Sequence, residues 1–308
     1  MRYKLLLLTS DNEGYRSLLK SCHLPEIEIL GDETHQITQA NIWLADPALA
    51  APLLPHSKHI LWMQSTLSGV GALVKPRQRK DYQLTNVRGI FGPLMSEYLF
   101  DSLLIHQHKR IIYRSQQAQK TWRPTSFKTL QGQHLLLLGT GNIAKHIAQT
   151  AKRFGMHVTG INRGAKPTIG FDNIDTLSNL PHYLPQADAI VSILPSTSDT
   201  RKALNAQTLS MMKPNGILFN LGRADVLDLN ALYLQLKQNR DQNAILDVFN
   251  QEPLPQHHPI RTLENVIITP HISAPRFPEL VVEIFANNYH KLLRGERLSH
   301  GVNFERGY

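Results

Sequence analysis

The chain is poor in cysteine: its 308 residues include only Cys22. A single cysteine excludes an intramolecular disulfide and a metal cluster held by several thiolates. Such scarcity is typical of a reducing compartment, so a cytoplasmic location is expected. The fifteen histidines lack the spacing of metal ligands, and no metal site is expected. The chain also lacks low-complexity tracts and internal repeats, and its composition is that of a globular protein.

Long hydrophobic runs are missing as well. None approaches the roughly 20 residues of a membrane-spanning helix, so no membrane association is expected. The opening segment MRYKLLLLTS is short and has no small-residue cleavage site after it, which favours a first strand over a signal peptide. Acidic residues are outnumbered, and the net charge is +9. Because the basic residues are scattered and the run Lys75–Lys80 is short, this charge fits an anionic small molecule better than nucleic acid.

The length predicts two domains, because 308 residues exceed one ordinary core. In the first part of the chain, short apolar runs alternate with helical or turn-rich segments, which predicts a small α/β domain. A helix is expected from Pro93 to about Ser115, before the loop WRPTSFKTLQGQ. The strands predicted in the first domain are KLLLLTS, IEIL, NIWLA, HILWMQS and YQLTNV.

A second α/β unit is predicted from His134, where a strand, a glycine turn, a helix and another strand follow in order. Further strands are expected at DAIVSILP, GILFNLG, NAILDVF and NVIITPHI, which predicts a doubly wound parallel sheet. A last helix is expected from about Pro278 to Leu293, and the tail GERLSHGVNF is expected to return to the first domain. The predicted domains are residues 96–280 and a discontinuous domain of residues 1–95 plus 281–308.

Three polar residues follow three of these apolar runs. Arg223 follows GILFNLG, Glu252 lies just past AILDVF, and His271 follows NVIITP. Since the carboxyl ends of parallel strands share one edge of a sheet, the three side chains are expected in one crevice. A guanidinium, a carboxylate and an imidazole can hold an anionic substrate and move a proton, which indicates an enzyme. Each residue also has a structural alternative: a surface ion pair, a cap of the EPLP turn or a loop histidine.

The segment Gly139–Ala144 matches G-x-G-x-x-G/A between an apolar strand and a helix, which is the context that a dinucleotide site requires. The helix N-terminus supplies N–H groups to the phosphates. The next strand ends in Asn162 and Arg163, where an NAD site normally has an acidic residue. Arg163 is expected to pair with a 2′-phosphate, which favours NADPH and leaves NADH possible. The alternative is that Arg163 is a solvated loop residue.

Together with SILPSTSDTRKALN, MMKPNGILFNLGRADVLD, LDVFNQEPLP and TPHISA, these motifs resemble the D-isomer-specific 2-hydroxyacid dehydrogenases, and among them the glyoxylate/hydroxypyruvate reductases. The resemblance is strong from about Gly92 to Ile284 and weaker in the first domain. It implies a Rossmann doubly wound parallel sheet, a smaller flavodoxin-like α/β substrate domain and a homodimer built on the cofactor domains. It also implies NAD(P)H-dependent reduction of a small 2-keto acid, with glyoxylate or hydroxypyruvate favoured. A dinucleotide-sensing regulatory protein of the same fold is the alternative.

The resemblance also assigns roles to residues. Arg223 would bind the substrate, His271 would donate the proton, and Glu252 would stabilise the imidazolium. Asp247 would bind the nicotinamide amide. The residues that would contact the cofactor are Gly139, Thr140, Gly141, Asn142, Ile143, Asn162, Arg163, Leu194, Pro195, Thr200, Leu221, Gly222, Asp247 and Ala274. Those that would contact the substrate are Leu67, Ser68, Gly69, Val70 and Arg223. Apart from the resemblance, Trp43 of the first domain is expected to line the substrate pocket, and a core position is the alternative for Trp43. Gly71 departs from the family, which commonly has aspartate there.

Overall fold

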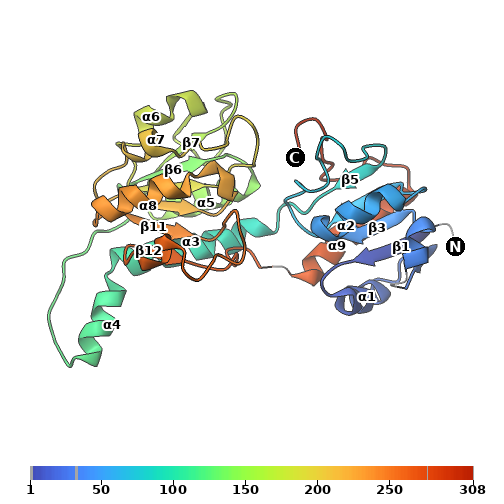
Figure 1. The fold of residues 1–308 in the computed structure, drawn as a ribbon, viewed down its shortest axis with the longest axis horizontal. Coiled ribbons are helices and arrows are strands. Elements are labelled where there is room, and N and C mark those ends of the chain that lie inside the picture. The colour runs from blue at the N-terminus through green and yellow to red at the C-terminus, as the bar shows by residue number, and fades with distance from the viewer. Residues whose placement is uncertain (1–2, 32–33, 276, 308) are drawn as a thin grey trace. The chain divides into compact units, whose positions relative to one another are not determined.

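A computed structural model describes residues 3–31, 34–275 and 277–307. The chain forms two compact units, residues 1–90 with 276–308 and residues 91–275 (Figure 1). The predicted boundaries, after residues 95 and 280, fall inside helices α3 (Phe91–Gln107) and α9 (Pro278–Leu293). The chain passes between units before each helix begins, and a helical pattern does not mark that point.

The first unit is built on a five-stranded parallel sheet in the order β2-β1-β3-β4-β5, which is the flavodoxin-like order. All five strands predicted from the apolar runs are confirmed. The strands are β1 (Tyr3–Leu8), β2 (Ile27–Ile29), β3 (Ile42–Ala45), β4 (Trp62–Ser65) and β5 (Gln83–Thr85). The helices are α1 (Asn12–Ser21), α2 (Pro47–Leu53) and α9, with 3-10 turns η1 (Thr34–Thr38) and η2 (Leu54–His56).

Helix α9, near the C-terminus, packs on the five-stranded sheet that the N-terminal part of the chain forms. Trp62 of β4 stacks on Phe285 of α9, with ring centroids 4.9 Å apart. After α9, the Val302 N–H donates to the Leu84 carbonyl at 2.8 Å, so the predicted return of the tail is confirmed. Trp43 requires a correction. Its side chain has no exposed surface and packs in the core with residues of α2, which supports the core alternative over a substrate pocket.

The second unit is built on a seven-stranded parallel sheet in the order β12-β11-β10-β9-β6-β7-β8. Chain order reverses between β6 and β9, as in a doubly wound dinucleotide-binding sheet. The sequence did not predict β8, because this short, partly exposed edge strand has no apolar alternation. The strands are β6 (His134–Leu138), β7 (His157–Ile161), β8 (Asn173–Asp175), β9 (Ala189–Ser192), β10 (Ile217–Asn220), β11 (Asn243–Leu246) and β12 (Val266–Ile268).

Both faces of the central strands of this sheet are buried. Leu136 and Leu138 of β6 belong to a cluster with residues of α8 (Leu229–Gln238), while Leu135 and Leu137 are equally buried on the opposite face. Alternation therefore gives no polar face, which explains the continuous apolar runs in the sequence. The remaining elements are α5 (Asn142–Arg153), α6 (Leu180–Tyr183), α7 (Ala206–Leu209), η3 (Leu177–Asn179), η4 (Ala224–Val226) and η5 (Pro259–Thr262).

The single helix predicted from Pro93 to Ser115 is wrong. Helix α3 ends at Gln107, and α4 (Arg110–Ala118) begins after Lys109, which has a left-handed φ of 54°. A left-handed residue breaks the helical hydrogen-bond ladder, and the local apolar spacing does not reveal it. No helix in the described part of the chain has both the length and the hydrophobicity needed to cross a membrane.

Candidate active site

The strands β10, β11 and β12 are neighbours in the sheet, and Arg223, Glu252 and His271 follow them. His271 Nδ1 lies 3.0 Å from Glu252 Oε2. The other carboxylate oxygen of Glu252 accepts the Phe249 N–H at 2.9 Å. Since an ionised carboxylate only accepts hydrogen bonds, Nδ1 carries the proton of this contact and Nε2 is left for another partner. The side chain of His271 is 57% exposed, so a small molecule can reach it.

Arg223, which follows β10, is half-buried. Its Nη1 donates to the carbonyl of Gly222 at 2.7 Å. Burial lowers the pKa of Arg223, while the carboxylates of Asp225 and Glu252 oppose that shift. Glu252 therefore lies close enough to act electrostatically on the guanidinium, and it also contacts the imidazole. The structure brings the three residues predicted from the strand ends into one group.

The loop that carries His271 is held from beneath by Asp247. His271 itself has a left-handed φ of 58°. Asp247 has no exposed surface; its Oδ1 accepts the Ile272 N–H at 2.8 Å and its Oδ2 accepts the Ser273 N–H at 2.9 Å. The resemblance assigned Asp247 to the nicotinamide amide, but the geometry favours a role in holding this loop.

Two further residues in this group were not predicted. Thr269 Oγ1 lies 2.6 Å from Asp247 Oδ1, and the hydroxyl of Tyr98 lies 2.6 Å from Thr269 Oγ1. Thr269 could have been suspected as a polar residue that closes an apolar run two positions before His271. Tyr98 gave no such signal, because it lies in the mainly apolar helix α3, far from His271 in the chain.

The glycine turn after β6 fits the pyrophosphate of a dinucleotide. Gly139 has a φ of 111°, a conformation that favours glycine, and a Cβ on Gly141 would meet no atom within 4 Å. The Lys145 N–H donates to the Gly141 carbonyl at 2.9 Å as the first helical bond of α5, so the N–H groups before it have no helical acceptor. A Cβ on Gly222 would lie 2.8 Å from the Cα of Ile193, so close packing of neighbouring loops requires glycine there.

At the adenosine side of the predicted cofactor site, Arg163 is paired with an aspartate that the sequence did not predict as its partner. Asn162 Oδ1 accepts the N–H groups of Gly164 and Lys166, both at 3.1 Å, so this side chain shapes the turn after β7. Arg163 Nη2 donates to Asp199 Oδ2 at 2.9 Å, and both side chains are exposed. The guanidinium expected to meet a phosphate therefore already faces a carboxylate from the loop after β9.

The remaining residues predicted to contact the cofactor lie on the loops after β9, β10 and β12. The Thr200 hydroxyl donates to the Pro195 carbonyl at 2.6 Å, which closes the loop after β9. Leu194 and Leu221 are largely buried, while Ala274 is partly exposed after β12. The loop after β9 borders the point where the strand order reverses, between β9 and β6, which is where dinucleotides bind in such sheets.

In the first unit, the predicted substrate loop follows β4. Ser65 Oγ donates to the Leu67 carbonyl at 2.8 Å, and Asn86 Nδ2 donates to the Ser68 carbonyl at 2.7 Å. Across residues 3–31, 34–275 and 277–307, the backbone N–H groups of Ser68, Gly69 and Val70 have no hydrogen-bond acceptor. Because the carbonyls of Leu67 and Ser68 already accept hydrogen bonds while these N–H groups have no acceptor, the loop is suited to bind an anion.

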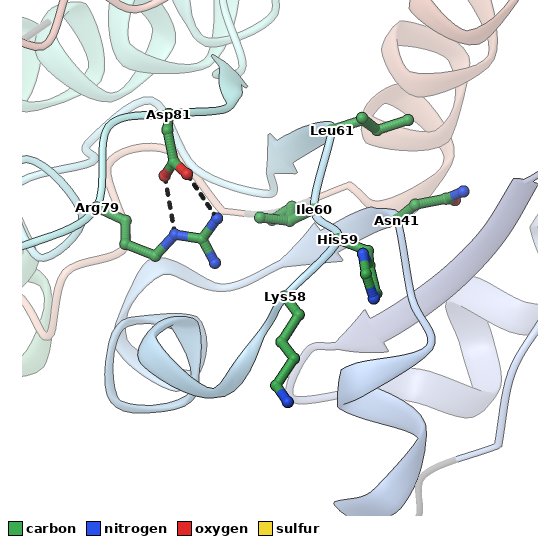
Figure 2. Close-up of a pocket in the computed structure, with 7 residues that line it drawn as sticks. All are labelled: Asn41, Lys58, His59, Ile60, Leu61, Arg79 and Asp81. Atoms are coloured by element: carbon green, nitrogen blue, oxygen red, sulfur yellow. Dashed lines mark hydrogen bonds and ion pairs between the residues drawn. The ribbon is translucent and has the colours of Figure 1, made fainter.

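A shallow pocket in the first unit is separate from this loop. Figure 2 shows Arg79 paired with Asp81 through two contacts of 2.8 Å. Asn41 and Leu61 precede β3 and β4, so the pocket lies at the amino ends of the strands, away from the Ser65–Val70 loop. Its lining residues are Asn41, Lys58, His59, Ile60, Leu61, Arg79 and Asp81.

The sequence and the fold match those of one known enzyme family. Residues 102–273 match the family model described as D-isomer specific 2-hydroxyacid dehydrogenase, NAD binding domain. The chain is 31% identical over 214 residues to glyoxylate/hydroxypyruvate reductase A of Serratia proteamaculans, covering 70% of this chain and 68% of the relative. It is 27% identical over 250 residues to the protein of the same name from Photorhabdus laumondii, covering 78% and 79% of the two chains.

Among solved structures, a D-isomer specific 2-hydroxyacid dehydrogenase family protein from Aeromonas salmonicida is 44% identical, with a TM-score of 0.92 and coverage of 99% of this chain and 100% of that chain. The segment that matches the family model, residues 102–273, includes the glycine turn, Arg223, Glu252 and His271. The chain belongs to the D-isomer specific 2-hydroxyacid dehydrogenase family and is an NAD(P)-dependent oxidoreductase.

Proposed function

We propose that this enzyme reduces a small 2-keto acid to the 2-hydroxy acid, with glyoxylate or hydroxypyruvate as substrate and NADPH as the favoured cofactor. The observation that carries the proposal is the 3.0 Å contact between His271 and Glu252 beside the half-buried Arg223. The two relatives named as glyoxylate/hydroxypyruvate reductase A support this choice of substrate.

Each polar residue has a distinct role in this proposal. A reduced nicotinamide dinucleotide supplies a hydride for the keto carbon. Arg223 binds the carboxylate and the keto oxygen of the substrate through its planar fork. His271 gives the proton on Nε2 to that oxygen as negative charge develops there. Glu252 holds the Nδ1–H, which fixes the direction of Nε2 and compensates the positive charge of the protonated ring.

The backbone supplies most of the remaining proposed contacts. The turn of Gly139, Thr140 and Gly141 and the first amides of α5, at Asn142 and Ile143, would hold the pyrophosphate. The N–H groups of Ser68, Gly69 and Val70, with Leu67 beside them, would bind a carboxylate. The other proposed cofactor contacts are Asn162, Arg163, Leu194, Pro195, Thr200, Leu221, Gly222 and Ala274.

The decisive assay is a panel of 2-keto acids at fixed NADPH and then at fixed NADH, for the wild type and for Arg163→Gln. We expect the highest kcat/KM with glyoxylate or hydroxypyruvate and NADPH. Arg163→Gln should lower kcat/KM for NADPH about tenfold and leave NADH nearly unchanged, because only NADPH has a phosphate to pair with the guanidinium. Asp199→Asn should improve NADPH binding, because it removes the carboxylate that competes for Arg163.

Arg153→Gln is the matched control, since Arg153 is exposed at the end of α5 and the substitution removes the same charge. A clear preference of the wild type for NADH would contradict the choice of cofactor. Tight NADPH binding without turnover of any 2-keto acid would favour the dinucleotide-sensing alternative instead.

We also propose that the segment from α4 to Phe127 is covered in a homodimer. Three apolar side chains of this segment are largely exposed to solvent: Ile111 is 64% exposed, Trp122 97% and Phe127 56%. Figure 1 shows α4 projecting from the end of α3, away from the sheet of its own unit. Several exposed apolar side chains within one short segment are typical of a protein interface, and a second copy carries the same segment for a symmetric contact.

The double substitution Ile111→Ser/Trp122→Ser should shift the protein from dimer to monomer in size-exclusion chromatography with light scattering. Ile169→Ser is the control, because Ile169 is 85% exposed outside this segment and its loss should leave the dimer intact. A monomeric wild type at micromolar concentration would contradict the proposal.

A further inference from the structure

A series of hydrogen bonds links helix α3 to the loop that carries His271. The Tyr98 hydroxyl lies 2.6 Å from Thr269 Oγ1, and Thr269 Oγ1 lies 2.6 Å from Asp247 Oδ1. Asp247 has no exposed surface, and Tyr98 and Thr269 are each half-buried. These hydrogen bonds therefore connect a side chain of α3 to the buried Asp247, at the ends of β11 and β12.

The chemistry of the three groups sets the direction of these bonds. An ionised carboxylate only accepts, so Thr269 donates its hydroxyl proton to Asp247. That proton is the only one on the Thr269 hydroxyl, so Tyr98 must donate to Thr269. Burial raises the pKa of Tyr98, which keeps the phenol protonated and able to donate.

Asp247 passes this constraint to the residues on the C-terminal side of His271. Its two oxygens accept the N–H groups of Ile272 and Ser273, at 2.8 and 2.9 Å. His271 has a φ of 58°, a conformation that residues other than glycine seldom adopt and that persists only where its surroundings enforce it. The hydrogen bonds to Asp247 fix the backbone on one side of His271, and Glu252 fixes its ring.

We propose that Tyr98 is a positioning residue for His271, acting through Thr269 and Asp247. The inference rests on the proposed function, in which His271 delivers the proton. Without the Tyr98 hydroxyl, Thr269 can rotate away from Asp247, and the carboxylate then loses one of the partners that hold it under the loop. A displacement of the imidazole by even about 1 Å can lower the rate of a proton transfer by up to about 100-fold.

The test is Tyr98→Phe, which removes only the hydroxyl. We expect kcat for the 2-keto acid to fall about tenfold, while the dissociation constant of NADPH stays within about twofold. In the protein without cofactor, hydrogen exchange of the Ile272 and Ser273 amides should become faster, since their acceptor is less firmly held. Tyr183→Phe is the control, because it also removes a tyrosine hydroxyl bonded to an aspartate in this unit, Asp175, at 2.9 Å.

Two substitutions of Thr269 keep the inference testable if Tyr98→Phe fails to fold. Thr269→Ser retains the hydroxyl and should keep nearly full kcat, whereas Thr269→Val removes it and should lose at least as much activity as Tyr98→Phe. The double variant Tyr98→Phe/Thr269→Val should be no slower than Thr269→Val alone, because both substitutions interrupt one chain.

Different results would defeat the two proposals. If Tyr98→Phe matches Tyr183→Phe in both kcat and amide exchange, or if Thr269→Ser and Thr269→Val lose activity equally, the inference about Tyr98 is wrong and the proposed function stands. If substitution of His271 itself leaves turnover intact, the proposed function fails.

Discussion

Substitution of His271 by asparagine is expected to lower kcat for the 2-keto acid by about 1,000-fold, within the range that general acid catalysis usually contributes. Asparagine removes the group that donates the proton but tolerates the left-handed backbone, where His271 has a φ of 58°. NADPH affinity should change little, because the proposed contacts to the pyrophosphate lie on the turn after β6 and the proposed contact to the 2′-phosphate, Arg163, follows β7. The measurements are steady-state kcat and the dissociation constant of NADPH from fluorescence titration.

His300→Asn is a close control for this substitution. His300 also has a left-handed backbone, with a φ of 61°, but it belongs to the first unit and the tail of the chain. Its backbone carbonyl, which accepts the Asn86 N–H at 3.1 Å, is unchanged by the substitution. A similar loss of kcat in both variants would show that backbone strain, rather than the missing proton donor, causes the effect. Near-normal kcat in His271→Asn would remove His271 from the proposed chemistry.

Substitution of Arg223 by lysine should lower kcat/KM for the 2-keto acid by about 100-fold. Lysine keeps the positive charge but cannot present two parallel N–H groups to a carboxylate and a keto oxygen. The half-buried position strengthens the effect, since the interaction is less screened by water than at the surface. We expect most of the change in KM for the 2-keto acid and a smaller change in KM for NADPH.

Arg201→Lys provides the comparison, because Arg201 lies 3.8 Å from the same Asp225 and its side chain is 71% exposed. This substitution should leave kcat/KM within about twofold, as exposed ion pairs contribute little. The melting temperatures of both variants should also be measured. Arg223 interacts electrostatically with Asp225 and Glu252, so its substitution can change stability as well as catalysis. Equal catalytic efficiency of Arg223→Lys and the wild type would show that the fork of the guanidinium is not needed.

The amino-acid sequence by itself determined the parallel α/β architecture and the strand ends that deliver Arg223, Glu252 and His271. Buried parallel strands need continuous apolar runs, and the polar residues that close such runs must lie at one edge of the sheet. The glycine turn after β6 was equally readable, since Gly139 and Gly141 meet local requirements of backbone conformation and space. These features depend on residues close together in the chain.

The tertiary structure alone decided which polar groups meet across the sheet and between helices. Tyr98 reaches Thr269, 171 positions away, and Arg163 pairs with Asp199, 36 positions away. It also placed Trp43 in the core and Asp247 under the His271 loop. Apolar spacing cannot give these results, because hydrophobic burial is non-directional and does not choose the partner of a particular hydroxyl, carboxylate or guanidinium. Those partners are fixed only when the packing of the strands and helices brings the groups within hydrogen-bonding distance.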